Sequence, residues 1–143
     1  RLIVPLPPTF GAFIIGSFVH TMLVIARLQC GLMIALVLSL LLPCTAYLQG
    51  QLVLVILVPV VMLGNAIYVL LTGKISSGWM GHILPALSKA CFMSAAWGFC
   101  AMSLLHLDLP AVVMPVLFAM SVPQLVTGII GRLLGKSILR RIS

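Results

Sequence analysis

The stretch DLPAVVMPVLFAMSVPQLVTGIIG, from Asp108 to Gly131, decides the fold of this chain. It is almost entirely apolar, and its one charged residue, Asp108, stands at its first position. An apolar run of about 20 residues can cross a bilayer as a helix, and Lys and Arg collect beyond the cytoplasmic end of such helices. This stretch leads directly into RLLGKSILRRIS, which is rich in Arg and Lys. We therefore predict a transmembrane helix that ends at a basic membrane face.

The composition of the whole chain agrees with a membrane protein. Of its 143 residues, 63% are hydrophobic and only 6% are charged, whereas a soluble domain carries about 25% charged residues. The net charge of +7 comes from eight Lys and Arg residues against one acid, and the cations lie at the ends of apolar runs. That placement is typical of topology signals. We therefore expect a lipid bilayer as the main partner and no nucleic-acid partner.

Four further apolar runs resemble the first in length. We predict an all-α fold, a polytopic transmembrane helical bundle of about five spans that forms a single domain over residues 1–131. The predicted spans are residues 9–26, 29–48, 52–72, 84–105 and 109–130. Most connections are so short that neighbouring helices must lie antiparallel and adjacent, and only residues 73–83 are numerous enough for a true loop.

The positive residues predict the orientation of the bundle. If the C-terminal tail is cytoplasmic, the turns that carry Arg27 and Lys74 lie on the same side of the membrane. The positive-inside rule then predicts an outside N-terminus and a cytoplasmic C-terminus. We expect an integral protein of a membrane of the bacterial inner type.

Residues 132–143 are predicted to form a short basic amphipathic cytoplasmic tail. Its expected membrane-surface residues are Arg132, Lys136, Arg140 and Arg141. Leu134, Ile138 and Ile142 would line roughly the opposite face of the same helix. Such a helix can lie along an anionic leaflet, or alternatively dock in the groove of a partner protein.

Polar residues inside the apolar runs are the best candidates for function, because polar groups are costly in a bilayer. Four of them fall at similar predicted depths on four different helices: His20, Asn65, Lys89 and Gln124. A shared depth predicts a common polar tier that serves as a ligand site or a proton path. The alternatives are that Lys89 extends its ammonium to the membrane surface and that the other three only make packing hydrogen bonds.

A ladder of small residues marks the fourth predicted helix as a packing helix. Its members recur every four residues: Ala86, Ala90, Ser94 and Gly98. Small residues at this spacing let another helix approach closely in a membrane. Gly131 and Gly135 repeat the pattern at the end of the last helix. We expect the fourth helix to be central to the bundle or to a subunit contact.

The chain lacks the residues that most enzymes need. It has no Glu, and its only Asp is Asp108 in a predicted turn. Paired carboxylates and a Ser-His-Asp triad are therefore impossible within this chain. We expect no catalytic residues, no metal site and no cofactor. A haem anchored by His20 is disfavoured, because His82 and His106 fall at opposite faces of the membrane.

Two functions remain open from the sequence. The first is a non-catalytic integral subunit of a multi-component membrane complex of the transport, secretion or energy-coupling type, packing through the fourth helix. It rests on the absence of soluble domains and on a lysine with no internal acid to pair with. The alternative is a small self-associating transporter or channel that uses the polar tier.

Overall fold

The computed structural model describes residues 8–50, 52, 54–75, 78–104 and 110–142. Within these residues the protein is all-helical, with 93% of them in helices and no strands. This confirms the prediction that the fold is all-α. Asp108 and His106 lie outside the described residues.

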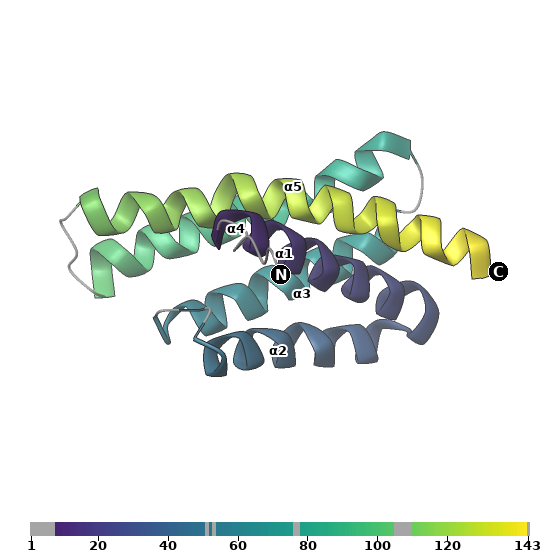
Figure 1. The fold of residues 1–143 in the computed structure, drawn as a ribbon, viewed down its shortest axis with the longest axis horizontal. Helices are drawn as coiled ribbons and strands as arrows, with labels where there is room; N and C mark the ends of the chain where they lie inside the picture. The colour runs from purple at the N-terminus through teal and green to yellow at the C-terminus, as the bar shows by residue number, and fades with distance from the viewer. Residues whose placement is uncertain (1–7, 51, 53, 76–77, 105–109, 143) are drawn as a thin grey trace, which may run out of the picture.

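The described part of the chain forms a bundle of five α-helices (Figure 1). Their bounds are α1 (Pro8–Ile25), α2 (Leu32–Leu48), α3 (Leu57–Lys74), α4 (Gly78–Phe99) and α5 (Pro110–Ile142). Short π-helical turns, Ala26–Cys30 and Cys100–Leu104, extend α1 and α4. Gly31 joins the first of these turns to α2 at a φ of 96°, a conformation that glycine adopts without steric cost.

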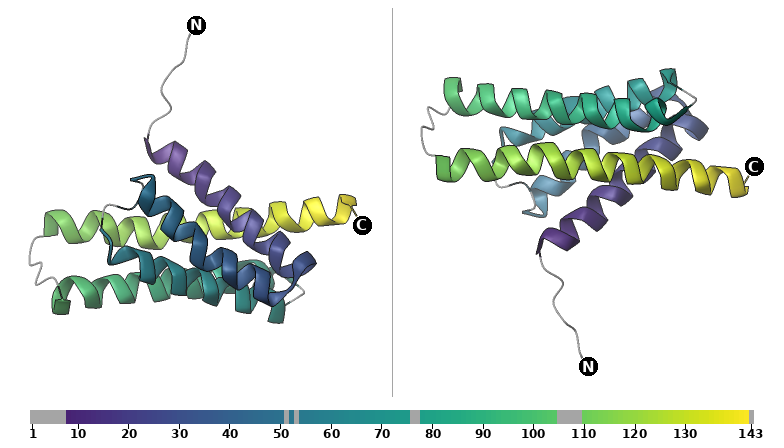
Figure 2. Two further views of the ribbon diagram at one scale, coloured as in Figure 1. Left: turned by 90° about the horizontal axis from the view of Figure 1, so that it is seen from below. Right: turned by 90° about the horizontal axis from the view of Figure 1, so that it is seen from above.

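The helices pack as a closed series. Helix α5 packs against α1 on one side and against α4 on the other, while α3 packs between α4 and α2. A smaller contact between α1 and α2 completes the ring. Figure 2 shows α4 and α5 lying side by side, with α1 crossing α5 obliquely and the end of α5 running past the other helices.

Helices α1 and α5 meet closely and run in the same direction. A Cβ added at Gly16 would lie 3.1 Å from Thr127 Cγ2, and one at Gly135 would lie 2.8 Å from Val24 Cγ1. Between them, a Cβ at Gly131 would overlap His20. Contacts that advance by four residues on both helices are the ridges-into-grooves packing of parallel neighbours. The glycines at 131 and 135 therefore allow α1 to pack directly against α5.

The surface of the bundle is apolar. Large hydrophobic side chains such as Phe18, Met33 and Phe118 are more than half exposed. Among the described residues, four segments are long and apolar enough to cross a membrane: Phe13–Cys30, Leu57–Lys74, Gly78–Ser103 and Val113–Ile142. Helix α2 is a shorter apolar helix of 17 residues.

The helix boundaries differ from the prediction around the middle of the chain. Helix α3 begins at Leu57 rather than at residue 52, and α4 begins at Gly78 rather than at residue 84. Gly78 has a φ of 80°, so the chain turns sharply there and α4 starts at once. The predicted loop over residues 73–83 is therefore mostly helix.

The C-terminal tail also differs from the prediction. Residues 132–142 are not a separate surface helix but the last turns of α5, which is one helix of 33 residues. The beginning of its basic face turns toward the bundle, since Arg132 is fully buried, whereas Leu134 and Ile138 are exposed. Close packing of Gly131 and Gly135 against α1 fixes this rotation of the helix.

Candidate functional site

The buried centre of the bundle is built around Lys89. Its Nζ lies 2.7 Å from Asn65 Oδ1 and 2.7 Å from His20 Nε2. The three residues come from α4, α3 and α1, and none of their side chains is more than 2% exposed. We call these three residues the lysine centre. It lies between two apolar clusters, one including Val24 and the other Trp97.

The hydrogen bonds around His20 determine which of its ring nitrogens donates and which accepts. His20 Nδ1 lies 2.6 Å from the carbonyl oxygen of Gly16, and a carbonyl oxygen only accepts hydrogen bonds. Nδ1 therefore carries a hydrogen, and in the neutral ring Nε2 is the acceptor. Lys89 Nζ then donates to both His20 Nε2 and Asn65 Oδ1.

The lysine centre contains no carboxylate. The described residues include no acid at all, because Asp108 is the only acidic residue of the chain. An ammonium at Lys89 is therefore surrounded by two neutral acceptors rather than by a counter-ion. The Lys89 side chain is buried inside the bundle and does not extend to the membrane surface, which was the alternative considered from the sequence. The described residues include no group of His, Cys, Asp or Glu that fits a metal ion.

A line of buried polar residues on α3 connects the centre to one end of the bundle. Tyr68 packs edge-on against the His20 ring, with centroids 4.9 Å apart, and its hydroxyl donates to the carbonyl oxygen of Gly128 at 2.7 Å. One turn further along α3, Thr72 Oγ1 accepts from Arg132 Nη1 at 3.4 Å. Asn65, Tyr68 and Thr72 thus form a polar line along one face of α3.

Gln124 does not join the lysine centre. Its side chain is half-buried, and the described partners of Lys89 Nζ are His20 and Asn65. The structure therefore brings together His20, Asn65 and Lys89, but not the fourth member of the predicted tier.

The small-residue ladder divides into two halves. Ala86 and Ala90 are buried, and a Cβ added at Gly128 of α5 would lie 2.8 Å from Ala86 Cβ. Ser94 and Gly98 are only half-buried, and no described atom lies within 4 Å of a Cβ placed at Gly98. The first half of the ladder therefore packs against α5, and the second half is open.

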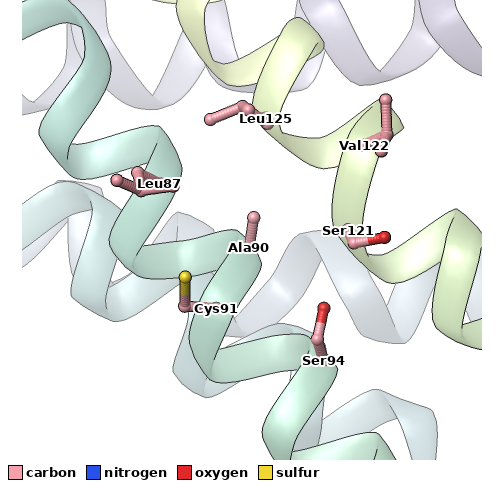
Figure 3. A pocket seen from close by; sticks show the side chains of 7 residues that line it. All are labelled: Leu87, Ala90, Cys91, Ser94, Ser121, Val122 and Leu125. Carbon is pink, nitrogen blue, oxygen red and sulfur yellow. The ribbon is translucent and has the colours of Figure 1, made fainter.

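Beside Ala90 and Ser94 the two helices leave a space between them, and they meet again at Trp97, whose Nε1 donates to the carbonyl oxygen of Val113. An apolar groove with a cavity volume of about 400 Å³ lies between α4 and α5. Figure 3 shows Ala90, Cys91 and Ser94 of α4 on one side of this groove and Ser121 and Leu125 of α5 on the other. The groove does not include any residue of the lysine centre.

The basic residues of the tail occupy different environments. Arg132 is fully buried, Lys136 is half-buried, and Arg140 and Arg141 are exposed. Arg132 was predicted to lie at the membrane surface, but its guanidinium donates from Nη2 to the carbonyl oxygen of Ile75, just after the end of α3. The carbonyl end of a helix carries a partial negative charge that attracts cations, which accounts for the inward position of Arg132.

Sequence reasoning missed Tyr68, Thr72 and the inward role of Arg132. A signal for the first two existed in the spacing of Asn65, Tyr68 and Thr72, which places all three on one helical face.

Comparison of the chain with known protein families, curated proteins and solved structures finds no significant match.

Replacing Tyr68 with phenylalanine is expected to lower the free energy of unfolding by about 0.5–1.5 kcal/mol, since it removes one neutral hydrogen bond. Unfolding by SDS in mixed micelles measures this change. Tyr47→Phe is the matched control, because Tyr47 is exposed at the end of α2. Equal stability of the two variants would contradict a structural role for the Tyr68 hydroxyl.

Proposed function

We propose that this chain is a small membrane transport protein whose lysine centre binds and releases a proton. The observation that carries the proposal is the burial of the Lys89 amine between His20 and Asn65, with no acid among the described residues. Ionisable residues within membrane spans commonly mark proton or substrate pathways. Two nitrogen bases at hydrogen-bond distance titrate as one unit and can exchange a proton.

The proton balance of the centre is simple. With Lys89 protonated, the centre carries one positive charge and Nζ donates to both of its neighbours. When the proton moves to His20 Nε2, Nζ keeps two hydrogens, still donates to Asn65 Oδ1, and accepts from Nε2 through its lone pair. Loss of a proton from the pair leaves the centre neutral. Since the centre links α1, α3 and α4, its change of charge acts on the packing of all three helices.

The polar line on α3 supports a route between the lysine centre and the basic end of the bundle. Tyr68 contacts His20 and Thr72 contacts Arg132, so polar atoms continue for two turns beyond Asn65. This route is closed in the present conformation, because the Tyr68 side chain is fully buried and its hydroxyl is hydrogen-bonded. Proton access through this line therefore requires a helix movement, as expected for a transporter that alternates between two states.

The bilayer arrangement that we propose has five spans, an outside N-terminus and a cytoplasmic C-terminus in a membrane of the bacterial inner type. At 17 residues, α2 is at the lower limit of the length that crosses a bilayer. The parallel packing of α1 and α5 supports the crossing of α2, because these two helices would run in opposite directions if only three of the first four helices crossed. Arg27, Lys74 and the basic end of α5 then share the cytoplasmic side.

A second candidate function is a subunit of a larger membrane complex. It is favoured by the open half of the small-residue ladder, where Ser94 and Gly98 would permit close approach of another helix. Lys89 does not favour this second function, because an amine that is 1% exposed is out of reach of a partner's carboxylate. Native mass spectrometry in mild detergent separates the two functions: copurifying foreign chains favour the subunit, and a homo-oligomer favours the transporter.

The transport proposal is tested by proton flux. Protein reconstituted in vesicles with an entrapped pH indicator and an imposed inside-negative potential is expected to acidify the lumen faster than protein-free vesicles do. An acidification rate equal to that of protein-free vesicles would contradict the proposal. Vesicles that contain heat-denatured protein control for leakage through a damaged bilayer.

A further inference from the structure

The polar line on α3 ends at a buried arginine of α5. The Arg132 side chain lies against the last turn of α3 and is fully buried. Its Nη1 donates to Thr72 Oγ1 at 3.4 Å, and its Nη2 donates to the carbonyl oxygen of Ile75. The last carbonyl groups of a helix have no partner within the helix, so they are ready acceptors for a guanidinium. Arg132 therefore covers the polar line where α3 ends.

Side chains rather than close helix packing join α3 to α5 along this line. Helix α3 packs mainly against α2 and α4, and α5 packs against α1 and α4. The hydroxyl of Tyr68 crosses from α3 to the carbonyl oxygen of Gly128 beside the His20 ring, and Arg132 crosses in the other direction nearer the end of α3. Release of these side chains can therefore part the two helices without breaking the main helix interfaces.

The start of α4 covers the contact between Arg132 and Ile75. Gly81 is buried, and a Cβ added there would lie 3.2 Å from the carbonyl oxygen of Ile75 and 3.3 Å from Arg132 Nη2. Three helices thus meet at this contact. In the closed structure the backbone of Gly81 shields it from water on the side of α4.

The charge of Arg132 closes the polar line as effectively as its volume does. A guanidinium keeps its charge at every physiological pH. An arginine fixed in a narrow pathway repels protons and other cations. Protons can therefore pass along the polar line to the lysine centre only when Arg132 moves away from α3.

We propose that Arg132 is the gate of the lysine centre, and that release of its hydrogen bonds to Thr72 and Ile75 admits water to the polar line from the basic end of the bundle. The side chain of an arginine is long and flexible, so that its guanidinium can leave α3 and reach the membrane surface. The purpose of the gate rests on the proposed proton transport, whereas its opening can be measured without any flux.

The test measures exchange of the Lys89 amine hydrogens with water, by solid-state NMR of the protein in bilayers. Buried hydrogens exchange through local opening, and Arg132→Met removes the bonds that oppose opening here. Exchange at Lys89 should become about tenfold faster, which corresponds to about 1.4 kcal/mol. Arg132→Lys keeps the charge and a donor for Ile75, so it should exchange more slowly than Arg132→Met. Arg141→Met is the matched control, because it removes an exposed charge from the same helix and should leave exchange unchanged.

Proton flux in vesicles separates failure of the gate from failure of the transport proposal. Arg132→Met should conduct protons faster than the wild-type protein, and the double variant Arg132→Met/Lys89→Met should not, because the route passes through the lysine centre. Faster exchange at Lys89 without flux in either protein would support the gate and contradict transport. Wild-type flux together with equal exchange in the wild-type protein and Arg132→Met would overturn the gate and leave transport standing.

A measurement on the wild-type protein decides the proposal even if Arg132→Met fails to fold. The gate must open before water reaches the lysine centre. After correction for intrinsic exchange rates, the Lys89 amine should therefore be at least as strongly protected as the hydrogens on Arg132 Nη2. Weaker protection at Lys89 than at Arg132 would show that water enters by another route and would overturn the proposal.

Discussion

Replacing Lys89 with methionine should reduce proton flux into vesicles to the level of protein-free vesicles. The substitution keeps an unbranched side chain, one atom shorter, and removes the amine that joins His20 to Asn65. Without that amine, the centre loses the nitrogen base that exchanges a proton with the imidazole. The same vesicle assay measures the loss, and indicator titration of the detergent-solubilised protein should show one fewer proton bound per chain.

The fold should survive this substitution. Removal of the buried charge relieves the cost of taking an ammonium out of water, while His20 Nε2 and Asn65 Oδ1 each lose a hydrogen-bond partner at a cost of about 1–3 kcal/mol. These effects oppose each other. Lys74→Met is the control, because Lys74 is exposed at the end of α3 and its loss should leave flux unchanged. Wild-type flux in the Lys89 variant would remove the lysine centre from the transport mechanism.

Replacing Gly131 with valine should destabilise the bundle by about 3 kcal/mol, the upper end of the range for overpacking. A Cβ at this position would overlap His20 and lie 2.9 Å from the backbone nitrogen of Thr21. Backbone atoms cannot move aside without displacing the whole of α1. The variant should therefore separate α1 from α5 and draw His20 away from Lys89. SDS unfolding measures the first effect, and proton flux measures the second.

Gly98→Ala is the matched control for the Gly131 variant. No described atom lies within 4 Å of a Cβ at Gly98, and alanine is favoured over glycine in a helix by about 0.5–1 kcal/mol. We expect this variant to be as stable as the wild-type protein or slightly more stable. If Gly131→Val were equally well tolerated, the close contact between α1 and α5 would be wrong.

The sequence was sufficient to predict the helical class and to identify three residues of the lysine centre. Their shared depth along separate helices placed His20, Asn65 and Lys89 at one level, and depth follows directly from the helical rise per residue. Gln124 has a similar predicted depth but does not reach the centre, because the rotation of α5 is set by Gly128, Gly131 and their contacts. Depth can be read from sequence, whereas rotation depends on which glycines meet a neighbouring helix.

The environment of Arg132 could not be predicted for a related reason. Its spacing with Lys136 and Arg140 is that of an amphipathic surface helix, and the pattern alone does not say which face turns inward. The structure continues α5 through this segment, so that Arg132 meets the carbonyl end of α3. The start of α4 was not predicted either, because two glycines and a histidine among residues 78–83 interrupt the apolar run.

The lysine centre is most directly tested by solid-state NMR of the protein in bilayers, with the nitrogens of Lys and His labelled. The structure predicts that His20 is neutral with its hydrogen on Nδ1, and that Nε2 is coupled through a hydrogen bond to Lys89 Nζ. It also predicts that the Lys89 amine is protected from exchange with water, while that of Lys74 is not. A neutral His20 ring with its only hydrogen on Nε2, or a Lys89 amine that exchanges as fast as that of Lys74, would contradict the existence of the buried centre.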